Sequence, residues 1–136
     1  MTTFDWNRYL ALAIELQKVQ DEASLRTAIS RAYYFVYNVA LNRPAVSQYR
    51  FDPKAPAHEQ LWALYTRNLG NCKLLAETAV RLKMKRVKAD YQNFSYPRVA
   101  DDLVGVLMDA QKCANILSAL DEDYPKPVPR SYSVGG

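Results

Sequence analysis

Apolar residues recur at helical spacing within the blocks of this chain that contain no proline. In residues 4–19 they return every three or four positions, and Thr2 or Thr3 can cap the start of such a helix. A longer block follows the polar break at residues 20–21 and ends before Pro44, since proline ends helices. Both blocks are predicted to be amphipathic helices. The inner face of the second is predicted to contain Leu25, Ile29, Ala32, Val36 and Val39.

Two further helices are predicted after the proline-rich segment 44–56. This segment has no sustained apolar period, and we expect a loop that forms one wall of a site. The third helix spans 57–68 and is closed by Gly70 in the left-handed conformation that glycine adopts readily. Asn71 is expected to cap the fourth helix, which spans 72–90.

The fourth helix and a fifth one, predicted over 98–120, each have an apolar stripe at helical spacing. Both stripes are predicted to face the core, because steps of three and four keep side chains near one side of a helix. On the fourth helix the stripe is Cys72, Ala76, Val80, Met84, Val87 and Tyr91. On the fifth it is Val99, Leu103, Val106, Ala110, Cys113, Leu117 and Leu120.

These elements predict an all-α protein, an antiparallel bundle of about five helices. A chain of 136 residues is long enough for one domain with its own core, and 49% hydrophobic and 24% charged residues are ordinary values for a globular protein. We assign residues 1–122 to the bundle. Residues 123–136 are rich in proline and poor in apolar side chains, so we expect a flexible tail.

Tyrosines are concentrated on the second helix, within the stretch RTAISRAYYFVYNVA. Tyr33, Tyr34 and Tyr37 are predicted to lie on the flanks of this helix, where a ring packs against the bundle and its hydroxyl stays polar. Stacking of these rings on nucleic-acid bases is the alternative.

The positive charge of the chain is concentrated in the fourth helix. Lys and Arg number 18, against 14 Asp and Glu, and the net charge is +4. Residues 71–90 alone hold six basic and two acidic residues, which accounts for the whole excess. Concentrated positive charge attracts phosphate backbones, and Arg81, Lys85 and Lys88 share one helix face. RNA, DNA or a nucleotide is therefore the predicted ligand, and an ordinary solvated helix face is the alternative.

The chain has few residues for metal or nucleophilic chemistry. Cys72 and Cys113 are far apart and His58 is the single histidine, so neither a zinc-binding spacing nor a Cys–His pair is indicated. We expect no metal, no cofactor and two buried cysteines. The uncharged run 32–42 is too short to span a membrane, and the N-terminus does not resemble a signal peptide. A cytoplasmic protein without a membrane partner is expected.

Two motifs together suggest a family. SRAYY at residues 30–34 lies on the second helix, and RVKADY at residues 86–91 ends the fourth. With the helices around them, over roughly residues 4–120, they resemble the HEPN superfamily, the "higher eukaryotes and prokaryotes nucleotide-binding" helical domains. Residues 86–91 have the family form of the second motif, Arg-x-x-Ala-Asp-Tyr.

The resemblance implies RNA chemistry or a supporting role in it. Many members of the family are metal-independent ribonucleases with an arginine followed a few residues later by a histidine. Here Arg86 is followed by Asp90 and Tyr91, without a histidine. The candidate catalytic residues are therefore Arg86 as the charge stabiliser and His58, Asp90 or Tyr91 as the proton carrier. Other members are non-catalytic partners of nucleotidyltransferases or antitoxin-type proteins.

The resemblance also implies a homodimer formed through the bundle helices. A second apolar face on the fourth helix, made of Leu75, Leu82 and Ala89, is the expected contact. Within the chain, Arg31 needs an acceptor if its guanidinium is partly buried. We predict that Arg31 and Asp90 form a structural clamp across the bundle.

We therefore expect an HEPN-like bundle that binds RNA or a nucleotide, or acts as a non-catalytic partner, in a toxin–antitoxin or defence-type system. The alternatives are a metal-independent ribonuclease with a degenerate Arg/His motif, and a module that only binds an acidic neighbouring protein. The predicted nucleic-acid-binding residues are Arg81, Lys85, Arg86, Lys88 and Tyr91.

Overall fold

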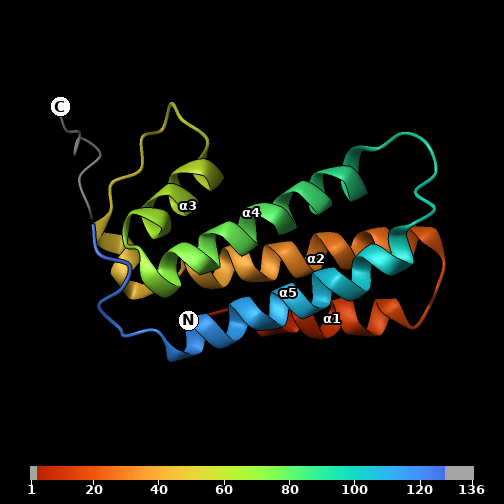
Figure 1. The fold of residues 1–136 in the computed structure, drawn as a ribbon, viewed down its shortest axis with the longest axis horizontal. Coiled ribbons are helices and arrows are strands. Elements are labelled where there is room, and N and C mark those ends of the chain that lie inside the picture. Colours follow the sequence, from red (N-terminus) through yellow and green to blue (C-terminus); the bar gives the residue numbers. More distant parts are fainter. Residues whose placement is uncertain (1–2, 128–136) are drawn as a thin grey trace.

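The computed structural model describes residues 3–127, which form a bundle of helices (Figure 1). No strand occurs in this part of the chain. The predicted all-α bundle is confirmed, and the long helices that follow one another in the chain, α1, α2, α4 and α5, alternate in direction (Figure 1). The elements are α1 (Asn7–Gln17), α2 (Glu22–Leu41), the 3₁₀-helix η1 (Pro44–Gln48), α3 (Ala57–Arg67), α4 (Gly70–Tyr91) and α5 (Val99–Ala119).

The central helix of the bundle is α2, which packs against α1, α4 and α5 (Figure 1). Asp21 caps its start, because the Asp21 carboxylate accepts the backbone N–H of Ser24 at 2.7 Å. The predicted inner face of α2 is confirmed, with Val39 only partly buried. The predicted inner face of α5 is confirmed as well, with Leu120 only partly buried after the helix has ended.

At the start of α1, the residue whose side chain bonds to the helix is Asp5 and not one of the predicted threonines. Its Oδ1 accepts the backbone N–H of Asn7 at 3.0 Å. The helix begins later than predicted, so a cap at Thr3 would lie too far from its first turn. Thr2 lies outside the described residues.

The buried face of α4 differs from the predicted one. The residues that enter the core include Leu75, Leu82 and Ala89, which are at most 5% exposed. We had expected these three to contact a second copy, and that prediction is wrong because the chain uses them in its own core. Of the predicted inner stripe, only Cys72 and Ala76 are buried. The other four members are exposed: Val80 43%, Met84 68%, Val87 41% and Tyr91 68%.

The physical reason is the way that steps of four turn around a helix. At about 100° per residue, each step of four moves a stripe by about 40°, so three such steps carry it about 120° around the axis. Steps of seven, which connect Leu75, Leu82 and Ala89, drift by only about 20° each. The second set therefore stays on one face along the whole helix, whereas the first turns from the core to the solvent after Ala76.

The segment between α2 and α3 is partly helical and is held by one buried side chain. Its first residues form η1, which buries Ala45 and Val46. Gln60 of α3 is 4% exposed; its side chain accepts the backbone N–H of Asp52 at 2.7 Å and donates to the carbonyls of Asp52 and Ala55, each at 2.9 Å. These bonds hold the loop at residues 52–55 against the start of α3, two residues from His58.

The turn between α3 and α4 is tighter than predicted. Gly70 has a positive φ of 51°, as expected, but it is already the first residue of α4. Leu69 precedes it with φ of 60°, and no side chain caps α4. The predicted cap by Asn71 is wrong, because Asn71 lies inside the helix.

The predicted tail starts against the bundle. The side chain of Asn68 accepts the backbone N–H of Lys126 at 2.8 Å and donates to its carbonyl at 2.9 Å. The remainder of the predicted tail, from residue 128 onward, lies outside the described residues. Within residues 3–127, none of the helices has the length and apolar character to cross a bilayer.

Candidate nucleic-acid interface

Arg86 is a buried cation on the side of α4 that faces α2. The residue is 8% exposed, and its guanidinium carbon is 5.2 Å from the ring centroid of Tyr34 and 5.8 Å from those of Tyr33 and Tyr91. One turn further along α4, Asp90 Oδ2 lies 3.4 Å from Nη1. The rings and the carboxylate offset the cost of burying this charge. The Nε atom is buried and has no hydrogen-bond partner within the described chain.

The single histidine lies against the same tyrosines. The Tyr33 hydroxyl is 2.6 Å from His58 Nδ1 and accepts the Trp62 indole N–H at 3.1 Å. The Tyr37 ring stacks on the imidazole with 3.9 Å between the centroids. Since the indole is only a donor, the tyrosine hydroxyl uses its own proton toward Nδ1. We assign the neutral tautomer of His58, with its proton on Nε2, from this network.

His58 is held in its neutral form. Burial lowers the pKa of its imidazole from 6.5 to about 4, and the nearby cations Lys83 and Arg86 act in the same direction. Burial also raises the pKa of the Tyr33 hydroxyl far above its usual value, so this group remains a proton donor. The site therefore presents a neutral imidazole beside a permanent guanidinium.

We expect an NMR titration of the one histidine in the chain to give a midpoint of about 4. Because the folded-state pKa lies below the unfolded value, the unfolded chain takes up the proton first as the pH falls. The stability due to neutral His58 is therefore complete above pH 6.5 and is lost between about 6.5 and 4. In His58→Gln this part of the pH dependence of unfolding should disappear. A titration midpoint above 6.5 would contradict the assignment.

The predicted clamp between Arg31 and Asp90 does not form. Asp90 Oδ2 accepts the Ser30 hydroxyl at 3.1 Å and lies 3.4 Å from Arg86 Nη1. The Arg31 guanidinium instead lies 5.0 Å over the ring of Tyr9 on α1. Adjacent helical residues point about 100° apart, so Ser30 faces α4 while Arg31 faces α1. A clamp to Asp90 exists, but Ser30 and Arg86 are its members.

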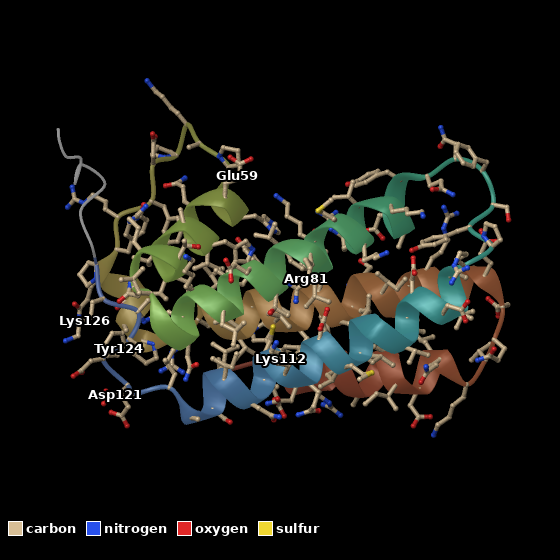
Figure 2. All side chains as sticks on the ribbon, viewed as in Figure 1. Glu59, Arg81, Lys112, Asp121, Tyr124 and Lys126 are labelled. Atoms are coloured by element: carbon tan, nitrogen blue, oxygen red, sulfur yellow. The ribbon has the colours of Figure 1, made fainter. Side chains whose placement is uncertain are left out.

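The predicted binding residues separate onto two sides of α4. Arg86 faces α2, whereas Arg81 and Lys85 line a cleft of about 210 Å³ against α5. Figure 2 shows Arg81 on this side of the helix. Lys85 Nζ is 3.2 Å from the Asp102 carboxylate, and Asp101 also lines the cleft. Carboxylates of α5 therefore offset part of the charge that the sequence concentrates on α4.

The C-terminal end of α4 carries exposed aromatic rings beside a lysine. Tyr91 is 68% exposed and Phe94, in the following loop, is 75% exposed. Lys88 Nζ lies 4.3 Å over the ring of Tyr96 and forms no ion pair with residues 3–127. Planar rings and mobile cations are the groups that hold single-stranded nucleic acid.

The structure thus brings His58 and Arg86 together around the tyrosines of α2, and Tyr91 lies beside Arg86. Sequence reasoning missed one residue of this group, Trp62, and did not predict that Tyr37 stacks on His58. A signal existed for Trp62, because it stands four positions after His58 and therefore shares its helix face. No spacing in the sequence indicated that Tyr37 stacks on His58, because this contact joins two different helices.

Comparisons with known proteins give no match. No protein-family model matches the chain, no curated protein matches it, and no solved structure matches it.

Proposed function

We propose that this chain is an HEPN-like helical bundle that binds RNA or a nucleotide at the C-terminal half of α4. In this proposal it serves in a toxin–antitoxin or defence-type system, as the binding component or as the non-catalytic partner of a nucleotidyltransferase. The two motifs that carry the resemblance support this proposal through their contacts, because Ser30 and Tyr34 of the first touch Asp90 and Arg86 of the second.

The observation that carries the proposal is the grouping of cations and accessible rings at one end of α4. Arg86 lies against Tyr34 and Tyr91, and the Tyr91 ring itself is accessible. Phe94 offers a second exposed ring, and Lys88 adds a cation that forms no ion pair with residues 3–127. Bases can stack on the two rings while the cations attract the phosphates, an arrangement that tolerates many sequences.

Mixed-sequence single-stranded RNA should bind the protein with an affinity that falls roughly tenfold when the salt concentration is raised about fourfold. Tyr91→Ala should weaken binding about tenfold by removing a stacking surface. Lys88→Gln should lower the steepness of the salt dependence by about 0.7, the value for one phosphate contact on a single strand. Fluorescence anisotropy of a labelled oligonucleotide measures all three effects.

Two lysines of the chain serve as controls in this experiment. Lys85→Gln should have less effect than Lys88→Gln, since Asp102 already offsets the charge of Lys85. Lys112→Gln, at an exposed lysine of α5, should leave binding unchanged (Figure 2). An affinity that is independent of salt, or equal losses in the Lys88 and Lys112 variants, would contradict the proposal.

A second candidate function is a metal-independent ribonuclease, and one contact favours it. Arg86 and His58 are far apart in sequence, yet both lie within 6.0 Å of the rings of Tyr33 and Tyr34. In the other neutral tautomer Nδ1–H donates to the Tyr33 hydroxyl, which leaves Nε2 free to accept a proton from a ribose hydroxyl. A guanidinium can stabilise the charge that develops on the phosphate. The same RNA, incubated in EDTA, distinguishes the two functions. Cleavage that is lost in both Arg86→Lys and His58→Gln would establish the ribonuclease.

A further inference from the structure

The apolar stripe that α4 leaves in solvent has no role in the proposed RNA site, apart from Tyr91 at its end. Val80, Met84, Val87 and Tyr91 follow one another at steps of four, three and four and are 41–68% exposed. They cover about three helical turns, or roughly 16 Å at 1.5 Å per residue. A continuous apolar stripe of this length on a surface helix marks a contact site.

The stripe forms one wall of a groove whose other wall is α3. The α3–α4 groove has a volume of about 600 Å³ and is lined by Trp62, Ala63 and Thr66 of α3 and by Val80, Met84 and Val87 of α4. Figure 1 shows why it is open, because α3 is short and lies beside only the first part of α4. The groove therefore continues into the uncovered stripe that ends at Tyr91.

The charges around the stripe select among its possible occupants. Lys83 lies at the groove and makes no ion pair with residues 3–127, and Arg81 and Lys88 flank the stripe on its other side. The carboxylate that lines the groove is Glu59, on the α3 wall, at the N-terminal end of that helix (Figure 2). The charged side chain that α4 contributes to the groove is thus a cation, and two further cations lie on the other side of the stripe.

This distribution of charge disfavours a second copy of the chain as the occupant. A two-fold axis through the middle of the stripe would bring Arg81 and Lys88 of one copy against the same cationic flank of the other. Juxtaposed like charges oppose association. A partner helix with carboxylates beside its apolar face would instead meet Lys83 on one side and Arg81 and Lys88 on the other.

The chemistry of the groove disfavours RNA in the same way. Beside Lys83, its α4 wall consists of valine and methionine side chains, which fit the knobs of a helix. The one aromatic ring of the lining, Trp62, is only 3% exposed and offers little surface for a base. Apolar positions spaced by three and four residues are the ridge that a second helix packs against. Methionine adapts its shape to different partners and is common on surfaces that bind helices.

We propose that the α3–α4 groove docks an acidic amphipathic helix of a partner protein, with carboxylates over Lys83 and Lys88 and an apolar face on Val80, Met84 and Val87. This inference goes beyond the proposed function and holds whether or not the chain binds RNA. A partner seated there would also end at Tyr91, beside the proposed RNA site, and would compete with RNA for Lys88.

The test uses a synthetic helical peptide of about sixteen residues, long enough to form a marginal helix in water. The peptide carries leucine at steps of four and three and glutamate on both flanks, and a matched peptide carries lysine in place of glutamate. Anisotropy of the labelled peptides against the intact protein should show saturable binding of the glutamate peptide, at least about tenfold tighter than binding of the lysine peptide. Met84→Glu should reduce that binding by at least about tenfold.

Met108→Glu is the matched control, because Met108 is 70% exposed and lies on α5, outside the groove. It should leave peptide binding unchanged, and circular dichroism should show that both variants remain folded. Equal binding of the two peptides, or no loss in Met84→Glu, would overturn the proposal. So would a protein dimer that Met84→Glu converts to a monomer, or RNA binding that Met84→Glu abolishes while the glutamate peptide fails to bind.

Discussion

Arg43→Ala should lower the free energy of unfolding by about 3 kcal/mol, as expected for the loss of several hydrogen bonds from a charged donor. Arg43 stands two residues after the end of α2, and its guanidinium contacts the C-terminal end of α5. Its Nη1 donates to the carbonyl of Leu117 at 2.8 Å and its Nε to that of Tyr124 at 3.0 Å. Its Nη2 donates to the carbonyls of Leu120 at 3.2 Å and Asp121 at 3.0 Å.

These acceptors matter because the last carbonyls of a helix have no partner within it. One side chain satisfies the end of α5 and the turn that follows, and it connects them to the end of α2. Urea unfolding, followed by circular dichroism, measures the loss. Arg43→Lys should recover only part of it, since an ammonium group does not reproduce the planar fork of donors.

Arg98→Ala is the matched control at the other end of α5. Its guanidinium pairs with Asp101 at 3.4 Å, but both side chains are more than 70% exposed. Exposed pairs contribute little, so the change should stay within about 0.5 kcal/mol. If Arg43→Ala and Arg98→Ala had equal effects, the role assigned to Arg43 would be wrong.

Leu82→Ala should destabilise the protein by about 3 kcal/mol, whereas Met84→Ala should change the free energy of unfolding by less than about 0.5 kcal/mol. Leu82 is 1% exposed and packs in the core, so its truncation leaves a cavity. Met84, only two positions away, is 68% exposed. Urea unfolding of the two variants gives the comparison, because a shifted midpoint with an unchanged slope reports a change in stability.

The two variants together test which face of α4 is buried. If Met84→Ala lowered the free energy of unfolding more than Leu82→Ala, the buried face of α4 would be the stripe that the sequence pattern predicted. It would also remove the basis for the α3–α4 groove as a docking surface, because the groove requires that Met84 be accessible.

The sequence predicted α2 and α5 well for a local reason. Their apolar residues alternate steps of three and four, which follow the helical period and leave one face for the core. In α4 two candidate faces were apolar, and the spacing by three and four predicted the stripe from Cys72 to Tyr91 as the buried one. Burial followed the set that stays on one side of the helix, Leu75, Leu82 and Ala89.

The sequence identified most single residues of the candidate site, but it did not predict which of them contact one another. Arg86, Tyr91 and His58 were each identified from sequence, and so was the acceptor Asp90. The partners differ from expectation, because Asp90 binds Ser30 and Arg86 while Arg31 turns toward Tyr9. The observed partner, Ser30, and the predicted one, Arg31, are adjacent residues of α2. No spacing rule within α2 determines which of the two faces α4.

The sequence by itself determined the helices, because proline positions, caps and the spacing of apolar residues act within a few residues of one another. Only the tertiary structure decided which face of α4 is buried and which side chains surround His58. Those outcomes depend on contacts between helices distant in sequence. When α2 packs between α1, α4 and α5, the most continuous apolar faces of these helices are buried together. This packing determines both the buried face of α4 and the surroundings of His58.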